Sequence, residues 1–387
     1  MEIRTAKGRL FLLLSVIILF PMAEHCFNFI IGTKLQGYFE QHPDVHFTPQ
    51  KWWDGSYQKE KTLYLNDSVG FRPDLVRMNN QLGFTFFNML YGTDTYVGHD
   101  HNLFSEQYIN EYEGRTHTAD SLVRSTMIKL RRVQDTLEHL GKTLVFTYAP
   151  SKPYYMPENL PDIFQRYGAH QTSNYTTFRR LSDSLGIKQI DFNALFIAMK
   201  DTSRGTLFTK QGLHWSFYGS LLAADTLIKF IERARNIRMQ DLVITRMAFS
   251  DDARGADNDL ANCTNLIFPV TKEKFCYPEY HFTTDSARTK PSAIFVGDSF
   301  IWSWMGNGFI QGDVRDWQYW YYFNEVWDVK AAGGQGQVQH IPTYNWQKKM
   351  MGTDCIVIVY TAPNLGSLCE KGSFIERMYS LFYPGQK

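Results

Sequence analysis

The feature that most constrains this fold is a regular alternation between amphipathic segments and short apolar segments from residue 118 onward. Over 118–140, apolar residues recur at the spacing of one helix face, and a continuous apolar segment follows at 144–148. The expected helices cover 118–140, 172–185 and 217–234, and the expected strands cover 144–148, 187–192, 293–296, 326–329 and 356–360. This alternation predicts an α/β fold, in which a parallel sheet carries helices on both faces. The reactive groups of such sheets lie at the carboxyl ends of the strands.

A long apolar run near the N-terminus predicts a membrane anchor. Residues 10–31 are mostly apolar, and a bilayer core needs about 20 such residues. Because Arg4, Lys7 and Arg9 precede the run, the positive-inside rule keeps the N-terminus in the cytoplasm and exports the rest. The segment 21–24 is a poor cleavage site, and no second long apolar run follows. We therefore favour an uncleaved single-pass anchor over a cleaved signal peptide.

The charge balance argues against a nucleic-acid partner. The 387 residues include 40 Lys and Arg and 39 Asp and Glu, so the net charge is +1 and the chain has no global basic field. Hydrophobic residues make up 44%, which is typical of a globular chain. We divide the chain into an anchor at 1–31, an aromatic and turn-rich segment at 32–117 that packs on the core, and an α/β domain at 118–387.

The cysteines leave two interpretations open. Four of the five follow the anchor, and the simplest pairing joins Cys263 to Cys276 and Cys355 to Cys369. They are equally well interpreted as unpaired core residues, because Cys355 begins an apolar strand. The absence of a CxxC spacing argues against a zinc site, and the polar segment 99–101 is interpreted as a turn rather than as a metal site. We expect neither a metal nor a cofactor.

Ser299 is the candidate nucleophile. It ends the tripeptide Gly297-Asp298-Ser299, which directly follows an expected strand and precedes an expected helix. That position offers backbone N–H donors and the positive end of a helix dipole. A nucleophilic serine needs such donors for the developing oxyanion, and it also needs a base.

His214 is the candidate base. It lies in a loop just before the helix expected from residue 217, with Trp215 and Gly219 close by in the sequence. These neighbours indicate a tightly packed turn. The alternative interpretation is a buried histidine at the start of a helix.

Several segments together carry a family resemblance. They are Trp53-Asp54-Gly55, Asn66-Asp67, Gly70-Phe71-Arg72, Val97-Gly98, Leu103-Phe104, Ala149-Pro150-Ser151-Lys152, His214-Trp215 with Gly219, and Gly297-Asp298-Ser299-Phe300. From about residue 50 to about residue 365, and in this order, the sequence resembles the periplasmic alginate O-acetyltransferases of the J and X type, which carry an SGNH-hydrolase-like domain.

The resemblance implies a three-layer SGNH-like fold with a permuted motif order, because His214 precedes Ser299. It implies that Gly333 or Gly334 and the amide of Asn364 face the oxyanion. The alternative interpretation of these three residues is that they only form turns. It also implies a single-pass inner-membrane protein, anchored through residues 10–31, with the bulk of the chain in the periplasm. The implied reaction is acyl transfer, most simply of acetyl, to hydroxyls of an exported polysaccharide through a Ser299 acyl-enzyme. A multi-pass membrane acyltransferase is the implied acyl donor partner.

One position departs from the family pattern. The family places Asp two residues before the histidine, whereas this chain has Gly212 there. We expect a backbone carbonyl or another acid, such as Asp191, to hold the imidazole. Without a replacement for the family's Asp, the chain either works with a Ser–His dyad or is an inactive homologue. Two further classes of function therefore stay open: a periplasmic carbohydrate esterase, and a non-catalytic assembly or glycan-binding protein.

Overall fold

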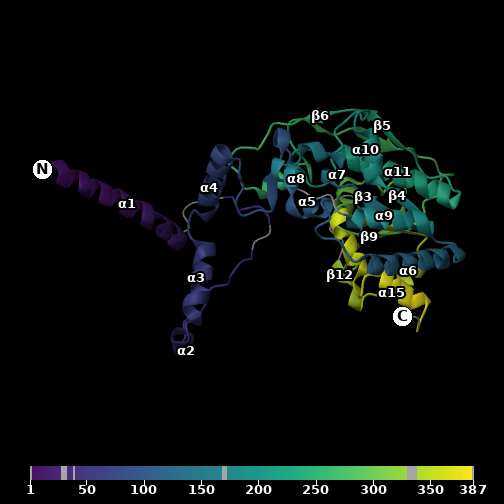
Figure 1. The fold of residues 1–387 in the computed structure, drawn as a ribbon, viewed down its shortest axis with the longest axis horizontal. Helices are drawn as coiled ribbons and strands as arrows, with labels where there is room; N and C mark the ends of the chain where they lie inside the picture. The colour runs from purple at the N-terminus through teal and green to yellow at the C-terminus, as the bar shows by residue number, and fades with distance from the viewer. Residues whose placement is uncertain (1, 28–32, 38–39, 168–171, 329–337, 386–387) are drawn as a thin grey trace. The chain divides into compact units, whose positions relative to one another are not determined.

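The computed structural model describes residues 2–27, 33–37, 40–167, 172–328 and 338–385 (Figure 1). Two compact units divide the chain: a smaller one of residues 1–93 with 261–269, and a larger one of 94–260 with 270–387. The larger unit thus begins at Asp94, whereas the sequence analysis placed its start at residue 118. The difference arises because residues 94–117 contribute Tyr108 to the main core and pair Leu103 N–H with Lys210 O at 2.8 Å.

The centre of the larger unit is a seven-stranded sheet. In spatial order its strands are β12 (Val338–His340), β11 (Glu325–Asp328), β10 (Arg315–Tyr321), β9 (Ser292–Gly297), β13 (Cys355–Thr361), β3 (Thr143–Ala149) and β4 (Gln189–Asp191). The five strands from β10 to β4 are parallel. Their carboxyl ends therefore meet at one edge of the sheet.

One strand of this sheet differs from the sequence analysis. The strand expected at 326–329 is β11, and it runs antiparallel to β10, with Tyr321 opposite Glu325. Only three residues join the two strands, which is too few for the crossover that a parallel neighbour needs. The end of β11 at Asp328 therefore points away from the edge where β9 ends.

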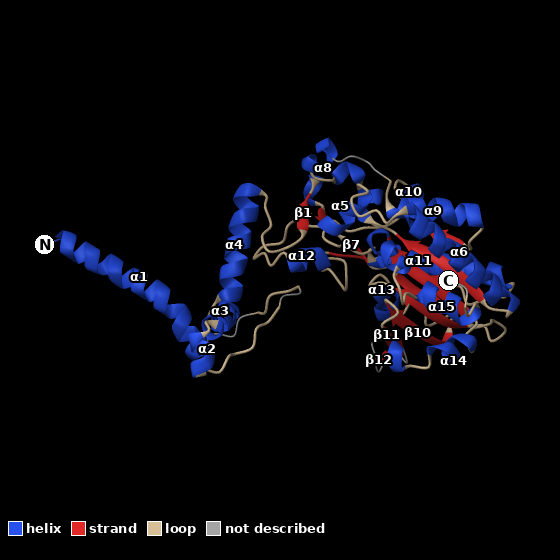
Figure 2. Cartoon of the chain, turned by 60° about the horizontal axis from the view of Figure 1, so that its bottom comes forward, coloured by secondary structure: helices blue, strands red, loops and turns tan. Residues whose placement is uncertain are grey.

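Helices cover both faces of the sheet (Figure 2). One face carries α10 (Phe192–Met199), α11 (Phe217–Arg235) and α13 (Ile301–Asn307), and the other carries α6 (Asp120–His139), α9 (Asn174–Leu185), α14 (Trp346–Met351) and α15 (Phe374–Phe382). Along β13, Val357 and Val359 join one core cluster while Ile356 and Ile358 join the other. This alternation gives three layers and confirms the expected α/β fold with helices on both faces of the sheet.

Shorter elements complete the larger unit. They are β1 (Thr95–Val97), β2 (Leu103–Ser105), α5 (Glu106–Tyr112), α7 (Lys152–Tyr155), α8 (Asp162–Tyr167), β5 (Leu242–Arg246), β6 (Phe249–Ser250), β7 (Phe275–Cys276), β8 (Glu279–Phe282), and the 3₁₀ turns at His99–His101, Pro157–Asn159, Ile341–Thr343 and Ala362–Cys369. Helix α12 (Asp259–Cys263) begins at the end of the larger unit's first segment.

Neither expected disulfide forms, because all five cysteines are free thiols. Cys355 belongs to the core on one face of the sheet and Cys369 to the core on the other face. The sheet lies between these two side chains, so the expected pairing is wrong. The alternative interpretation, unpaired core residues, describes Cys355, Cys369 and Cys276, all of which are buried.

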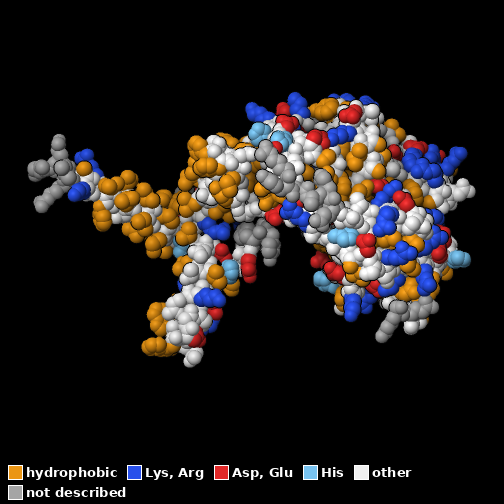
Figure 3. Space-filling view, in the orientation of Figure 1, with side chains coloured by type: hydrophobic (Ala, Val, Ile, Leu, Met, Phe, Trp, Pro, Cys, Tyr) orange, Lys and Arg blue, Asp and Glu red, His pale blue; other side chains and the backbone are white. Residues whose placement is uncertain are grey.

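The smaller unit is helical. It contains α1 (Glu2–Phe27), α2 (Pro49–Trp53), α3 (Ser56–Ser68) and α4 (Arg72–Phe87). Within α1, Ala6–Phe27 is long and apolar enough to cross a membrane, with a mean hydropathy of 2.1. Hydrophobic side chains cover this helix (Figure 3). The last residues of the expected anchor, 28–31, lie outside the described residues.

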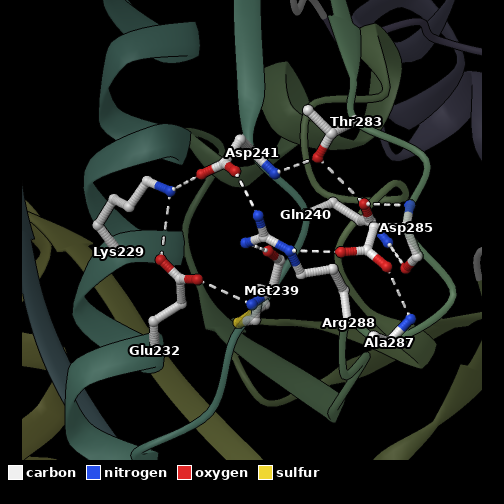
Figure 4. Close-up of polar contacts among 9 residues, drawn as sticks. All are labelled: Lys229, Glu232, Met239, Gln240, Asp241, Thr283, Asp285, Ala287 and Arg288. Carbon is white, nitrogen blue, oxygen red and sulfur yellow. Dashed lines mark hydrogen bonds and ion pairs between the residues drawn. The ribbon is translucent and has the colours of Figure 1, made fainter.

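A polar cluster fixes the ribbon of β5 and β8 to α11 (Figure 4). The Arg288 guanidinium donates to Asp241 Oδ2 at 3.0 Å and to Met239 O at 2.7 Å. Asp241 also pairs with Lys229 of α11, and Glu232 of the same helix accepts the Met239 N–H at 2.8 Å. These contacts hold the loop after α11 against that helix.

Candidate active site

The turn after β9 places Ser299 at the carboxyl edge of the sheet, two residues before α13 begins. Gly297 allows this turn to form. A Cβ at Gly297 would lie 1.9 Å from Val359 O, so no other residue fits the approach of β9 to β13. The sequence thus sets the position of Ser299 through the glycine two residues before it.

Asp298 ties this turn to the end of β13. Its buried carboxylate accepts hydrogen bonds at Oδ2 from Thr361 N at 2.7 Å and from Thr361 Oγ1 at 2.6 Å. Asn364 Nδ2 donates to the same oxygen at 2.9 Å and to Thr361 Oγ1 at 3.0 Å. Asn364 therefore lies beside the serine turn, with its amide directed at Asp298. Its role toward an oxyanion stays a prediction.

His214 meets Ser299 at this edge. The imidazole Nε2 lies 2.8 Å from Ser299 Oγ, although 85 positions separate the two residues in the sequence. Trp215, only 1% exposed, packs against Phe300 and Trp304 and so anchors the loop of residues 209–215, called here the histidine loop. The structure thus brings together the two residues that the sequence analysis singled out.

The other imidazole nitrogen faces a carboxylate that the sequence analysis missed. Asp259 Oδ2 lies 2.5 Å from His214 Nδ1, and Asp259 Oδ1 accepts the Leu213 N–H at 2.7 Å. Because a carboxylate only accepts, Nδ1 carries the hydrogen and neutral Nε2 is left to accept from Ser299 Oγ. Ser299, His214 and Asp259 therefore form a continuous hydrogen-bonded series.

Asp191, the acid suggested from the sequence, does not hold the histidine. It caps α10, where its Oδ1 accepts the Ala194 N–H at 3.0 Å, and its Oδ2 accepts the Tyr175 hydroxyl at 2.8 Å. Asp191 ends β4, which is separated from β9 by β13 and β3. It lies at the correct edge of the sheet but on the wrong strand.

Gly212 is required by the path of the histidine loop. A Cβ at Gly212 would lie 2.6 Å from Thr209 Oγ1 and 2.9 Å from Ala256 O. An aspartate at this position would therefore not fit. In this chain the carboxylate reaches the imidazole from Asp259 instead.

The two glycines expected to line the oxyanion site, Gly333 and Gly334, lie outside the described residues. The strand expected before them, β11, is antiparallel to β10, so the rule for strand ends gives these glycines no support. Their proposed role is left with the family resemblance alone.

The electrostatics of the site favour a stronger base than an ordinary histidine. Burial lowers the pKa of His214, but the charge and hydrogen bond of Asp259 and the charge of Asp298 outweigh it. The net pKa of His214 is raised above its ordinary value. Stabilisation of the imidazolium suits a group that accepts a proton during the reaction.

The buried amine of Lys152 binds backbone oxygens of the histidine loop. Lys152 Nζ donates to the backbone oxygens of Leu103 and Lys210, each at 2.8 Å, and of Gly212 at 3.3 Å. Burial lowers the pKa of Lys152 to about 7. Glu273, which lies outside this loop, accepts the N–H of loop residue Lys210 at 2.9 Å. The histidine loop is thus held through its backbone at Lys210 and at Gly212.

The three-layer α/β fold, with a Ser–His–Asp series at the carboxyl edge of its sheet, fits a protein of the SGNH-hydrolase-like class. Residues 96–301, more than half of the chain, match the family model described as the SGNH hydrolase-like domain of the acetyltransferase AlgX. The chain therefore belongs to this AlgX-type family.

Individual relatives are distant. The probable alginate O-acetylase AlgJ of Pseudomonas putida is 26% identical over 137 residues, which are 35% of this chain and 34% of the relative. The chain thus matches about a third of that relative's length. Pseudomonas aeruginosa AlgX has the same fold, with a TM-score of 0.50 and 14% identity over 76% of this chain and 69% of that one. The O-acetyltransferase domain of Pseudomonas putida AlgJ gives a TM-score of 0.46 and 17% identity over 74% and 99% of the two chains.

Proposed function

We propose that this chain is an O-acetyltransferase that carries the acyl group on Ser299. The observation that supports the proposal is the series Ser299 Oγ–His214 Nε2 at 2.8 Å and His214 Nδ1–Asp259 at 2.5 Å. A serine activated by an oriented imidazole is the standard arrangement for acyl transfer through a covalent intermediate. Asp259 weakens the case for an inactive homologue, because it supplies the acid that Gly212 does not.

The proposed reaction has two matching halves. In the first, His214 Nε2 takes the hydroxyl proton while Ser299 Oγ attacks the acyl carbonyl of the donor, and the leaving group departs with that proton. In the second, His214 takes the proton of an acceptor hydroxyl, whose oxygen attacks the acyl-serine and forms the new ester. Ser299 then recovers its proton from His214. Asp259 stabilises the imidazolium formed in each half.

The family and the first helix support proposals for the acceptor and the location. The relative from Pseudomonas putida is named as an alginate O-acetylase, so we propose hydroxyls of an alginate-like exported polysaccharide as the acceptor. We propose that α1 is a single-pass inner-membrane anchor and that the larger unit works in the periplasm. A multi-pass membrane acyltransferase is the proposed source of the acyl group.

Acetyl analysis of surface polysaccharide tests this function in cells. We expect cells with Ser299→Ala to lose the ester-linked acetyl, and cells with the exposed control Ser286→Ala to retain it. Unchanged acetyl content with Ser299→Ala would support a non-catalytic assembly or binding protein. An increased acetyl content would support the esterase alternative, in which water replaces the sugar hydroxyl as the acceptor.

A further inference from the structure

Helix α4 of the smaller unit exposes a continuous apolar face. Leu75, Met78, Leu82 and Phe86 are between 45% and 71% exposed. Their spacing of three or four residues places them along one side of the helix. We call these four residues the α4 apolar face. In water such a row is unfavourable, because each side chain keeps its apolar area hydrated.

The opposite side of α4 is the side that packs, and it is partly polar. The two buried residues of α4 are Asn80 and Gly83. Asn80 Nδ2 donates to Thr264 O at 2.8 Å, and Gln81 Oε1 accepts the Phe268 N–H at 2.9 Å. Phe268 itself is 66% exposed. This helix therefore turns an apolar row outward, while two of the groups that bind it to its own unit are side-chain amides.

The start of α4 contacts the candidate membrane span directly. The Phe71 and Phe20 rings stack with their centroids 5.0 Å apart, and His25 Nδ1 lies 2.6 Å from Ser68 O. A Cβ at Gly70 would lie 2.4 Å from Pro21 O. Phe20 is seven residues before the end of α1, about 10 Å along the helix axis. The corner between α3 and α4 is thus packed against the last turns of α1.

From these contacts we propose that the α4 apolar face lies on the lipid surface of the bilayer that α1 crosses. The inference rests on the proposed anchoring of α1. A helix that begins in contact with Phe20 begins within about 10 Å of the end of the candidate span. Interfacial helices bury their apolar side to about this depth, so the exposed side of α4 then meets acyl chains rather than water. Hydrophobic side chains gather both along α1 and over α4 (Figure 3). The smaller unit therefore contacts the membrane in two places: α1 spans the bilayer, and the α4 apolar face lies at its interface.

Depth-dependent quenching in lipid vesicles tests this assignment. The full chain, with Cys26→Ser and Cys263→Ser, would carry one environment-sensitive fluorophore at Leu82→Cys, Ile17→Cys or Ser125→Cys. It would be reconstituted in vesicles of phosphatidylethanolamine and phosphatidylglycerol that contain spin-labelled lipid. We expect the probe at Leu82 to lose most fluorescence to a label near the headgroups and the probe at Ile17 to a label near the bilayer centre. The probe at Ser125, exposed on α6, should be unaffected.

The outcomes separate the inference from the anchoring. Quenching at Ile17 without quenching at Leu82, repeated with the probe at Phe86→Cys, would overturn the lipid assignment and leave the anchor intact. Absence of quenching at Ile17 would contradict the anchor itself and the inference with it. Shielding of Leu82 in native membranes but not in pure lipid would assign the face to a membrane protein partner and would also overturn the proposal.

Discussion

At the residue scale, Asp259 is the side chain that gives His214 its direction and its raised pKa. Loss of a triad acid costs up to about 10⁴-fold in rate, so we expect Asp259→Asn to slow acyl transfer by a factor of that order. The proposed base, His214, works in its neutral form, so we expect the wild-type rate to rise with pH through a pKa above the ordinary histidine value. Asp259→Asn removes the negative charge that raises the pKa of His214. The rising limb of the pH–rate profile should therefore move to lower pH.

A pH profile of kcat/KM for both proteins checks this prediction. Asp252→Asn, at an exposed position in the segment before α12, is the matched control and should leave the profile unchanged. A full rate with an unshifted limb in Asp259→Asn would show that Asp259 does not act through the imidazole.

Gly212 carries the second prediction at this scale. Because a Cβ there would approach Thr209 Oγ1 and Ala256 O closely, we expect Gly212→Ala to lower the free energy of unfolding by about 1–3 kcal/mol. Gly212→Asp should not raise the rate, since its side chain has no room beside an imidazole already bound to Asp259. Denaturant unfolding and a transfer assay measure both effects. A faster Gly212→Asp enzyme would mean that the loop can open for a second acid.

Lys152 gives a stability prediction with a definite sign. Its pKa is about 7 in the folded chain, whereas an unfolded lysine keeps the ordinary value near 10.5. Between these values the unfolded chain binds more protons, so this residue's contribution to stability becomes more favourable as pH rises. We expect the free energy of unfolding of the wild type, relative to Lys152→Met, to rise by about 2 kcal/mol from pH 7 to pH 9. A difference that stays constant with pH would contradict the lowered pKa.

At the element scale, the turn after β9 depends on the close approach of β9 to β13. We expect Gly297→Ala to destabilise the protein by about 2 kcal/mol or more, since its Cβ would overlap Val359 O. Gly306→Ala in α13 is the control, because nothing lies within 4 Å of its Cβ position, and it should be neutral or stabilising. Thermal unfolding of the two variants compares them directly. Equal stabilities would show that the two strands can separate without cost.

The same scale shows what the sequence alone could predict. Periodicity is local, so the helix expected at 118–140 appears as α6 and the strand expected at 356–360 as β13. The direction of a strand is not local, and the three residues after β10 reverse the chain into β11. The expected strands did not include β10 at 315–321, so the short connection that reverses the chain was not visible in the sequence.

The candidate site divides in the same way. Ser299 and His214 were recognisable because each lies beside a glycine-containing turn at the start of a helix. Asp259 lies 45 positions after His214, at the start of α12, and no short pattern encodes the path of the chain that leads to it. The pair of acids at 257 and 259 is the one local signal that marks this segment. Asp191 fitted the rule for strand ends, which cannot say which strand lies next to β9.

At the scale of the whole molecule, the two units have separate tasks in this account. The smaller unit carries the candidate span and the α4 apolar face, and the larger unit carries the Ser–His–Asp series. Acyl transfer near a membrane needs an enzyme that stays close to its donor while its site remains open to a polymer. A smaller unit with two membrane contacts would keep the enzyme close to its donor.

The central claim is that Ser299 becomes acylated. The most direct measurement is mass spectrometry of the purified full chain after exposure to p-nitrophenyl acetate, followed by peptide mapping. We predict one acetyl group on Ser299 in the wild type, none in Ser299→Ala, and slower formation in Asp259→Asn. A correctly folded wild type that acquires no acetyl group, or acquires it only at another residue, would contradict the account.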